Sequence, residues 1–224
     1  MTTIAILGTG LLGSGFVENL LQKGHTVRVW NRTASKLEPL TDKGAIAAAD
    51  PAAAVRGATH VHLVLSEDAA VDEVIAALRP GLGAGVPVID HSTNLPQKVA
   101  QRFADLRAAG VHYVSAPVFM SPQNARDASG MMLLSGPTAD CDALEPHLAA
   151  MTGKVLRCGE RPDLAAAQKL SGNSMFFAMA AAMHDVLAIG RGCGIDDATM
   201  LGLYDVYPIG RSLPWIGARA AAAG

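Results

Sequence analysis

The first part of the chain, up to about residue 160, alternates short apolar runs with longer helical patterns. The apolar runs predict strands at Thr3–Leu7, Thr26–Trp30, His60–Leu65, Val86–Asp90, Val111–Ser115, Met131–Leu134 and Val155–Arg157. Helical patterns lie between several of these runs, at Leu12–Lys23, Ala69–Leu78, Gln97–Ala109 and Asp140–Met151. Strands that alternate with helices pair in parallel through crossover connections. The pattern therefore predicts an α/β fold with a doubly wound, mostly parallel sheet.

The pattern changes after residue 162. One long helical pattern, rich in Ala, Leu and Met, runs from Asp163 to about Arg191. A second helix is expected to start at Asp196-Asp197, because acidic side chains suit the positive N-terminal end of a helix. We therefore expect two domains, a complete α/β domain at 1–162 and a short all-helical domain at 163–224.

Composition limits the classes of protein to consider. Half of the 224 residues are hydrophobic and 17% are charged, which is typical of a chain with a packed core. A net charge of −2 gives no general attraction to nucleic acid or to a membrane, so any anion site must be local. The three cysteines are far apart, and neither a leader nor a membrane span is evident, so a cytoplasmic protein is expected. The seven histidines include no pair at helical ligand spacing, and no metal site is predicted.

A glycine-rich turn stands between the first predicted strand and the first helix. The residues Gly8-Thr9-Gly10-Leu11-Leu12-Gly13 read G-x-G-x-x-G. The first glycine permits a tight turn, the second lets the backbone approach a pyrophosphate, and the third lets helix and strand pack closely. The N–H groups that begin the helix then point at the phosphates. The turn predicts a dinucleotide site that includes Gly8, Gly10, Leu11, Leu12 and Gly13.

The end of the second strand indicates which dinucleotide binds. An NAD-preferring site places an acidic residue there, which binds the ribose 2′-hydroxyl. This chain instead has Asn31-Arg32-Thr33, with Lys36 one helical turn further. An acid would repel a 2′-phosphate, whereas Arg32 can fork onto it and Thr33 can donate a hydrogen bond. A solvated arginine at a strand end is the alternative, but after a phosphate turn at this spacing the residues favour NADP(H) over NAD(H).

Together these motifs resemble the β-hydroxyacid dehydrogenase family. That family includes 3-hydroxyisobutyrate dehydrogenase, glyoxylate/succinic semialdehyde reductases, imine reductases and, more distantly, 6-phosphogluconate dehydrogenase. The resemblance covers nearly the whole chain and is carried by Gly8 to Gly13, Asn19-Leu20, Gly24-His25, Val27, Val29 to Thr33, Leu65-Ser66-Glu67-Asp68, Asp90-His91-Ser92-Thr93, Ala116-Pro117-Val118, Lys169 and Asn173. It implies a Rossmann-type domain, a nicotinamide cofactor and a small-molecule substrate.

The resemblance also implies roles for residues that follow the later strands. Leu65 and Ser66 would line the cofactor, Thr93 would lie near the nicotinamide ribose, and Ser92 would lie near the substrate. In sheets of this kind ligands bind beyond the carboxyl ends of the strands, which is where all these segments end.

Lys169 and Asn173 are the catalytic candidates. They are four residues apart in the long helical pattern and so share one face. From this spacing alone, a lysine that reaches solvent beside a solvent-facing asparagine is the favoured interpretation. The resemblance reverses it, because it implies that Lys169 protonates a carbonyl oxygen while Asn173 holds the lysine in place. A lysine among Ala, Leu and Met can be partly desolvated, which lowers its pKa and suits proton transfer.

One segment departs from the family pattern. The family has Asp-Ala-Pro-Val-Ser-Gly-Gly, whose serine and glycine N–H groups hold a substrate carboxylate, whereas this chain ends the motif with Phe119, Met120 and Ser121. Bulky side chains close the backbone to a carboxylate, and Phe119 makes the wall apolar. These residues predict a larger, less charged carbonyl or imine substrate. Alternatively, Ser121, Gln123 or Asn124 replace the lost donors.

The helical region is shorter than the resemblance implies for this family. A bare apolar helix would expose a hydrophobic face, and such a face normally marks a subunit interface. We therefore expect a symmetric homodimer in which the long helices of two subunits pack together. The alternative is that the sequence is part of a longer protein.

Three functions are consistent with these residues. The first is an NADP(H)-dependent oxidoreductase that transfers hydride between nicotinamide and a carbonyl or hydroxyl substrate, with Lys169 as general acid/base. The apolar wall formed by Phe119 and Met120 favours an imine reductase-like enzyme as the second. The short helical region leaves a third, a protein that binds NADP(H) without catalysis.

Overall fold

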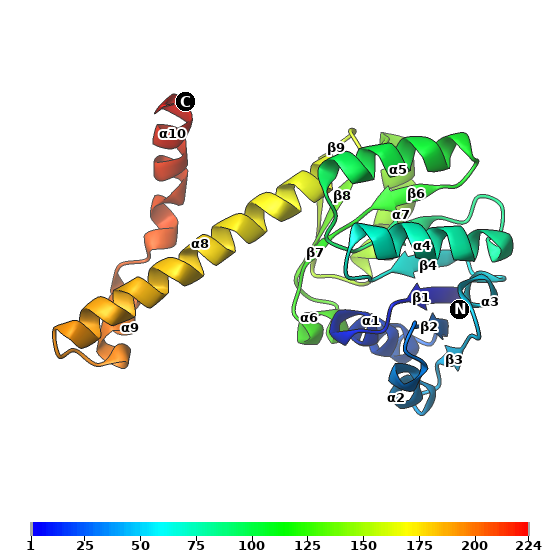
Figure 1. Cartoon of the computed structure of the whole chain (residues 1–224), viewed down its shortest axis with the longest axis horizontal. Coiled ribbons are helices and arrows are strands. Elements are labelled where there is room, and N and C mark those ends of the chain that lie inside the picture. Colours follow the sequence, from blue (N-terminus) through cyan, green and yellow to red (C-terminus); the bar gives the residue numbers. More distant parts are fainter. Residues whose placement is uncertain (1, 224) are drawn as a thin grey trace. The chain divides into compact units, whose positions relative to one another are not determined.

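The computed structural model of the chain describes residues 2–223 (Figure 1). The strands described are β1 (Thr3–Leu7), β2 (Thr26–Trp30), β3 (Ile46–Ala47), β4 (His60–Leu63), β5 (Val88–Asp90), β6 (Tyr113–Ser115), β7 (Val118–Phe119), β8 (Met131–Ser135) and β9 (Lys154–Gly159). The helices between them are α1 (Leu11–Gln22), α2 (Glu38–Thr41), α3 (Pro51–Val55), α4 (Asp68–Leu78), α5 (Pro96–Ala108), α6 (Pro122–Arg126) and α7 (Thr138–Ala149). Short 3-10 turns stand at Ala34–Leu37 and Arg79–Gly81.

The strands form one sheet in the order β3-β2-β1-β4-β5-β6-β8-β7, with β9 beside β8. The pairs from β3 to β6 are parallel. Strand β8 runs antiparallel to β6 and β7 and parallel to β9. The chain starts in the middle of the sheet at β1, builds outward to β3, and then returns to build the other half from β4. The prediction of a doubly wound, mostly parallel sheet is confirmed.

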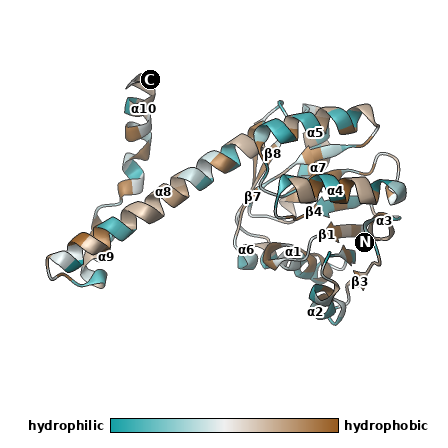
Figure 2. Cartoon of the chain, viewed as in Figure 1, coloured by the Kyte–Doolittle hydropathy of each residue, from teal (hydrophilic) through white to brown (hydrophobic). Residues whose placement is uncertain are grey.

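Side chains alternate between two apolar layers, one on each face of the sheet. On β1, Ile4 and Ile6 belong to the layer covered by α1, α6 and α7, whereas Ala5 and Leu7 belong to the layer covered by α4 and α5. The helices α4 and α5 carry both hydrophobic and hydrophilic residues, while β1 is largely hydrophobic (Figure 2). Because the sheet is covered on both faces, its central strands are rich in apolar residues, which is why they were recognisable as short apolar runs.

The short elements were not predicted. Strands β3 and β7 have two residues each, and α6 has five, so none carries a periodic pattern of its own. Each exists because a neighbour supports it: β7 pairs with β8, and Ser121 caps α6 by accepting a hydrogen bond from the N–H of Asn124. The longer elements begin and end within a few residues of their predicted limits.

The long helix is α8 (Leu164–Gly192), followed by α9 (Asp197–Val206), a 3-10 turn at Ile209–Ser212, and α10 (Leu213–Ala223). Asp196 caps α9 by accepting a hydrogen bond from the N–H of Thr199, as its acidic side chain suggested. The chain divides into two compact units, Met1–Ser171 and Gly172–Gly224. The division lies within α8 rather than before it, because Ala165 and Ala166 at the start of the helix are buried in the first unit.

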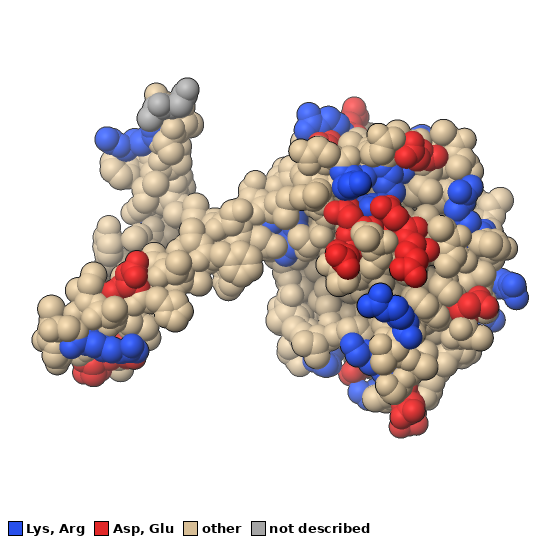
Figure 3. All heavy atoms as spheres, viewed as in Figure 1, with Lys and Arg blue, Asp and Glu red and all other residues tan. Residues whose placement is uncertain are grey.

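On the face of the first unit shown in Figure 3, acidic side chains gather near the middle, with basic side chains above and below them. Among the helices described in residues 2–223, none is both long enough and apolar enough to cross a membrane.

Candidate functional site

The glycine-rich turn joins β1 to α1, and two of its glycines are required by close packing. Gly8 has φ +99°, and a Cβ added there would lie 2.2 Å from the carbonyl oxygen of Val64. A Cβ on Gly13 would lie 2.0 Å from the carbonyl oxygen of Gly8, so helix and turn are in direct backbone contact. A Cβ on Gly10 would meet nothing within 4 Å. Gly10 therefore leaves open space in front of the backbone, where a phosphate could approach.

Asn31 connects the glycine-rich turn to the end of β2. Its Oδ1 accepts a hydrogen bond from the N–H of Thr9 at 3.1 Å, and its Nδ2 donates to the carbonyl oxygen of Thr33 at 2.9 Å. The backbone N–H of Gly8 also donates to the carbonyl oxygen of Trp30 at 2.9 Å. These hydrogen bonds fix the position of the glycine-rich turn, predicted to hold the diphosphate, relative to the end of β2, predicted to hold the 2′-phosphate.

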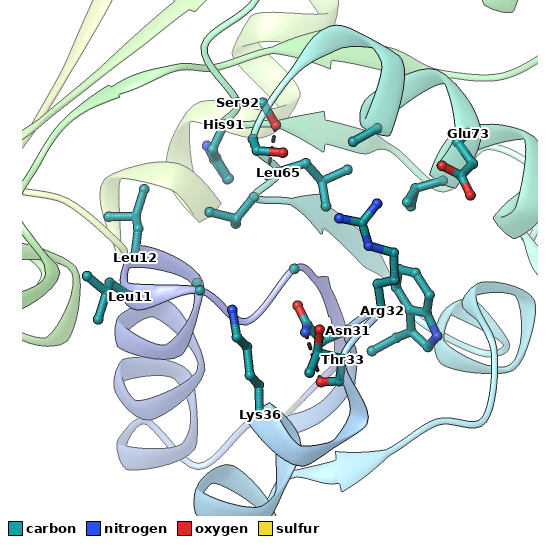
Figure 4. A pocket seen from close by; sticks show the side chains of 18 of the residues that line it. Leu11, Leu12, Asn31, Arg32, Thr33, Lys36, Leu65, Glu73, His91 and Ser92 are labelled. Atoms are coloured by element: carbon teal, nitrogen blue, oxygen red, sulfur yellow. Dashed lines mark hydrogen bonds between the residues drawn. The ribbon is translucent and has the colours of Figure 1, made fainter.

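These segments line a pocket of about 490 Å³ at the carboxyl ends of β1, β2, β4 and β5 (Figure 4). Every cofactor-binding candidate lies on its wall, and so does Ser92. The lining residues are Gly8, Gly10, Leu11, Leu12, Gly13, Trp30, Asn31, Arg32, Thr33, Lys36, Val64, Leu65, Ser66, Ala70, Glu73, Val74, His91, Ser92 and Thr93. The structure thus brings these candidates together, and their contacts with a cofactor stay a prediction.

Two cations stand on one side of the pocket. Arg32 follows β2 and Lys36 lies in the next turn, and both side chains are exposed. Among residues 2–223, no carboxylate forms an ion pair with either of them, so both can engage an anion. Glu73 of α4 also lines the pocket, on the same side as Arg32 in Figure 4. Glu73, Ala70 and Val74 were not predicted, although they occupy one face of the helix at spacings of three and four residues.

The far end of the pocket is supported by a buried polar network. Ser92 Oγ accepts a hydrogen bond from the N–H of Leu65 at 3.0 Å, and the N–H of Ser92 donates to Asp90 Oδ1 at 2.9 Å. Tyr113 donates its hydroxyl proton to Asp90 Oδ2 at 2.8 Å, and Arg102 Nη1 lies 3.9 Å from the same oxygen. Burial raises the pKa of Asp90, and the hydrogen bonds from Ser92 and Tyr113 oppose that rise. The network fixes the segment that carries Ser92 and Thr93.

The predicted substrate wall and the lysine candidate meet in the first unit. Phe119 lies on β7, and Lys169 Nζ is 4.2 Å from the centroid of its ring, which is a cation–π distance. Burial lowers the pKa of Lys169, as expected for an ammonium that has lost part of its hydration. Asn173 follows one helical turn later on α8, in the second unit, and its partnership with Lys169 stays a prediction.

The polar groups after Phe119 are occupied within their own helix. Ser121 and Asn124 form a reciprocal capping box at the start of α6, and Gln123 donates to both carboxylate oxygens of Asp127 at 3.0 and 2.9 Å. Met120, which precedes the cap, packs against the apolar layer under α1. This arrangement disfavours the alternative in which Ser121, Gln123 or Asn124 replace the family's carboxylate-binding donors.

Comparison with known proteins agrees with the dinucleotide-binding geometry of the pocket. The model of the NAD binding domain of 6-phosphogluconate dehydrogenase matches residues 3–159. The chain belongs to this family. Its sequence is 33% identical over 182 residues to 3-sulfolactaldehyde reductase of Escherichia coli (strain K12), a match that covers 80% of this chain and 61% of that protein. The chain thus spans about three fifths of the length of that relative.

Solved structures of two enzymes superpose on the chain. An imine reductase of Streptomyces aurantiacus has a TM-score of 0.89 at 25% identity, and the match covers 98% of this chain and 78% of that one. The 3-hydroxyisobutyrate dehydrogenase of Mycobacterium tuberculosis has a TM-score of 0.83 at 22% identity. The match covers 91% of this chain and 70% of that one, and it shows that the two share a fold. The resemblance to β-hydroxyacid dehydrogenases seen in the sequence is confirmed.

Proposed function

We propose that this family member is an NADP(H)-dependent oxidoreductase that reduces a carbonyl or imine substrate or oxidises the corresponding hydroxyl or amine. The observation that carries the proposal is the pocket itself. An open glycine turn at the start of α1 lines the same cavity of about 490 Å³ as Arg32 and Lys36, two cations beyond β2 that form no ion pair within residues 2–223. A backbone open to a diphosphate and a fork of positive charge for a 2′-phosphate are the features that such a cofactor needs.

Binding of the two nicotinamide cofactors tests this proposal directly. We expect NADPH to bind the purified chain in a calorimeter more tightly than NADH by roughly 10- to 100-fold, the value of a charge-assisted contact to the additional phosphate. Equal affinities would contradict the preference for NADP(H), and the absence of binding of either nucleotide would overturn the function.

Lys169 is the proposed proton donor. The cofactor, when bound, would supply a hydride to the substrate carbon. The Lys169 ammonium would donate its proton to the carbonyl oxygen and become a neutral amine, which regains a proton from solvent. Partial burial favours this step, because it lowers the pKa of Lys169 toward the pH at which proton transfer is efficient.

The apolar character of the wall favours an imine as a second class of substrate. Lys169 faces the ring of Phe119, and the neighbouring Ser121 and Asn124 are hydrogen-bonded to each other. A substrate carboxylate would therefore meet few free donors on this side. Comparing NADPH oxidation with a semialdehyde and with a cyclic imine separates the two classes. If a broad panel of aldehydes, ketones and imines gives no turnover while NADPH still binds, the protein is a non-catalytic NADP(H)-binding protein.

We also propose that the second unit holds a homodimer together. Large apolar side chains are exposed on α8, α9 and α10, including Phe176 at 69%, Phe177 at 66% and Trp215 at 64%. Exposed apolar surface of this extent is unusual in a monomer, and a second copy of the chain supplies a matching face by symmetry. Light scattering on an eluting size-exclusion peak should give twice the mass of 23.1 kDa. The double variant Phe176→Lys, Phe177→Lys should shift the mass toward that of a monomer, and a monomeric wild type would contradict the proposal.

A further inference from the structure

Three histidines far apart in the sequence form a continuous series of hydrogen bonds, here called the histidine chain, on the face of the sheet that α7 covers. His91 follows β5, His62 lies on β4, and His147 lies on α7. His91 Nε2 and His62 Nδ1 are 2.8 Å apart, and His62 Nε2 and His147 Nε2 are 2.9 Å apart. His62 has no exposed surface and His91 is 3% exposed, so water does not compete for these nitrogens. His91 also lines the cofactor pocket, beside Ser92 (Figure 4).

The carbonyl group of Ala116 determines which nitrogen donates in each hydrogen bond of the histidine chain. His91 Nδ1 lies 2.7 Å from the carbonyl oxygen of Ala116, which can only accept a hydrogen bond, so His91 Nδ1 must carry a proton. In a neutral ring the other nitrogen is then an acceptor, so His62 donates from Nδ1 to His91 Nε2. By the same reasoning His62 Nε2 accepts, and His147 donates from Nε2. The three rings therefore have one consistent set of tautomers.

The neutral state of the chain agrees with its surroundings. Burial lowers the pKa of His91 to about 4, and burial together with repulsion from His60 and His25 lowers the pKa of His147 to about 3. The pKa of His62 lies well below its ordinary value for the same main reason, loss of hydration. The nitrogens of His62 are both engaged by other imidazoles, and among residues 2–223 no group of His, Cys, Asp or Glu side chains is arranged to hold a metal ion.

His91 connects three strand ends next to the pocket. Its backbone N–H donates to the carbonyl oxygen of Leu63 at the end of β4, at 2.9 Å. Its ring donates to Ala116, just beyond β6. Ser92 and Thr93, the next two residues, line the pocket. Because both ring nitrogens are engaged inside the fold, His91 can neither give a proton to a bound molecule nor accept one from it.

We propose that His62 is a positioning residue for the cofactor pocket: its imidazole holds His91 in one tautomer and one orientation, and thereby holds the Ser92–Thr93 segment against the end of β6. The cofactor part of this inference rests on the proposed function. The role belongs to His62 because its Nδ1 is the donor that engages His91 Nε2, and because its own ring has no exposed surface and is bound through both nitrogens.

The tautomers can be read in the wild-type chain without any variant or ligand. Histidine 15N–13C correlation spectra at pH 7.5 should show His91 and His62 protonated at Nδ1 and His147 protonated at Nε2. Assignment follows from the loss of one set of signals in each single-histidine variant. A spectrum in which His91 is protonated at Nε2, or is doubly protonated, would overturn the proposal.

Two amide variants separate positioning from mere filling of space. In His62→Asn the amide nitrogen is attached to Cγ, as Nδ1 is, and can still donate to His91. In His62→Gln the amide is one carbon further out, near the place of Nε2, and can meet His147 but not His91. We expect NADPH to bind His62→Asn within about threefold of the wild type and to bind His62→Gln and His62→Leu about tenfold more weakly, as when a buried acceptor loses its donor.

The result that would overturn the positioning role is tight NADPH binding by a folded His62→Leu, or equal weakening in His62→Asn and His62→Gln. If His62→Leu does not fold, the comparison of the two amide variants remains decisive. The failure of the proposed function looks different: the wild type would show the expected tautomers and bind no NADPH. That result would overturn the cofactor part of the inference and leave the tautomer chain supported.

Discussion

At the scale of single residues, the site depends on what each side chain leaves free. Gly10 leaves its backbone open, and Arg32 and Lys36 leave their charges without an ion-pair partner among residues 2–223. Ser121 and Asn124, by contrast, are hydrogen-bonded to each other and leave little for a ligand. The difference between free and engaged polar groups is what directs the chemistry toward a phosphate on one side and an apolar substrate on the other.

Replacing Arg32 tests the phosphate contact. Arg32→Ala should weaken NADPH binding by roughly 1.5–3 kcal/mol, the value of a charge-assisted hydrogen bond, and leave NADH binding nearly unchanged, because NADH has no 2′-phosphate. Calorimetry with both nucleotides measures the two effects. Arg28→Ala is a matched control, since Arg28 lies on β2, the strand that Arg32 follows, and donates to the carbonyl oxygen of Ala53 rather than lining the pocket. Equal losses for NADPH and NADH would refute the assignment.

Replacing Lys169 tests the proton donor. Lys169→Ala should slow turnover of an accepted substrate by about 10²- to 10⁴-fold while NADPH affinity is retained, because the proton is needed for the chemical step and not for cofactor binding. Lys169→Arg is the informative companion, since it keeps the charge over Phe119 but donates a proton poorly near neutral pH. Stopped-flow NADPH oxidation reports the rate. Full activity in either variant would end the proton-donor proposal.

At the scale of elements, the sequence predicted those strands, helices and turns whose residue pattern lies within a single segment. Strand β1 is largely apolar because both faces of the sheet are covered, and the glycine turn is a local motif between a strand and a helix. Strand β7 and helix α6 were missed because pairing with β8 and a capping box define them. The chain formed by His62, His91 and His147 could not be predicted, since its members are brought together only by the tertiary fold.

The packing of α1 against the glycine turn gives a matched pair of variants. Gly13→Ala should lower the free energy of unfolding by about 2–4 kcal/mol, because its Cβ would overlap the carbonyl oxygen of Gly8 and force turn and helix apart. Gly10→Ala should fold normally, since its Cβ meets open space, but should bind NADPH more weakly by blocking the phosphate. Urea unfolding and calorimetry measure the two effects. A stable Gly13→Ala, or unaltered NADPH binding by Gly10→Ala, would contradict this account.

At the scale of the whole molecule, the buried histidines link stability to pH. In the unfolded chain a histidine has a pKa of about 6.5, whereas burial keeps His62, His91 and His147 neutral in the folded protein to much lower pH. At pH values well above 6.5 neither state binds these protons, and stability does not change with pH on their account. As the pH falls below 6.5 the unfolded state takes up protons that the folded state does not, so each histidine lowers the free energy of unfolding by up to about 1.4 kcal/mol per pH unit. The loss continues until the pH reaches the pKa of the folded state, about 4 for His91.

Comparing the wild type with His62→Asn isolates the contribution of His62 to this pH dependence of stability. At pH 7.5 the variant should be less stable, because the smaller side chain leaves space and loses the bond to His147. Below pH 6.5 the unfolded variant has one histidine fewer to protonate, so it loses less stability than the wild type. The difference in unfolding free energy between wild type and variant should therefore narrow by about 1.4 kcal/mol per pH unit. Urea titrations at pH 7.5, 6.5 and 5.5 give the three values. If the difference for His62→Asn instead stays constant with pH, His62 takes up its proton in the folded protein as readily as in the unfolded chain, and the neutral, directed tautomers of His91, His62 and His147 do not persist there.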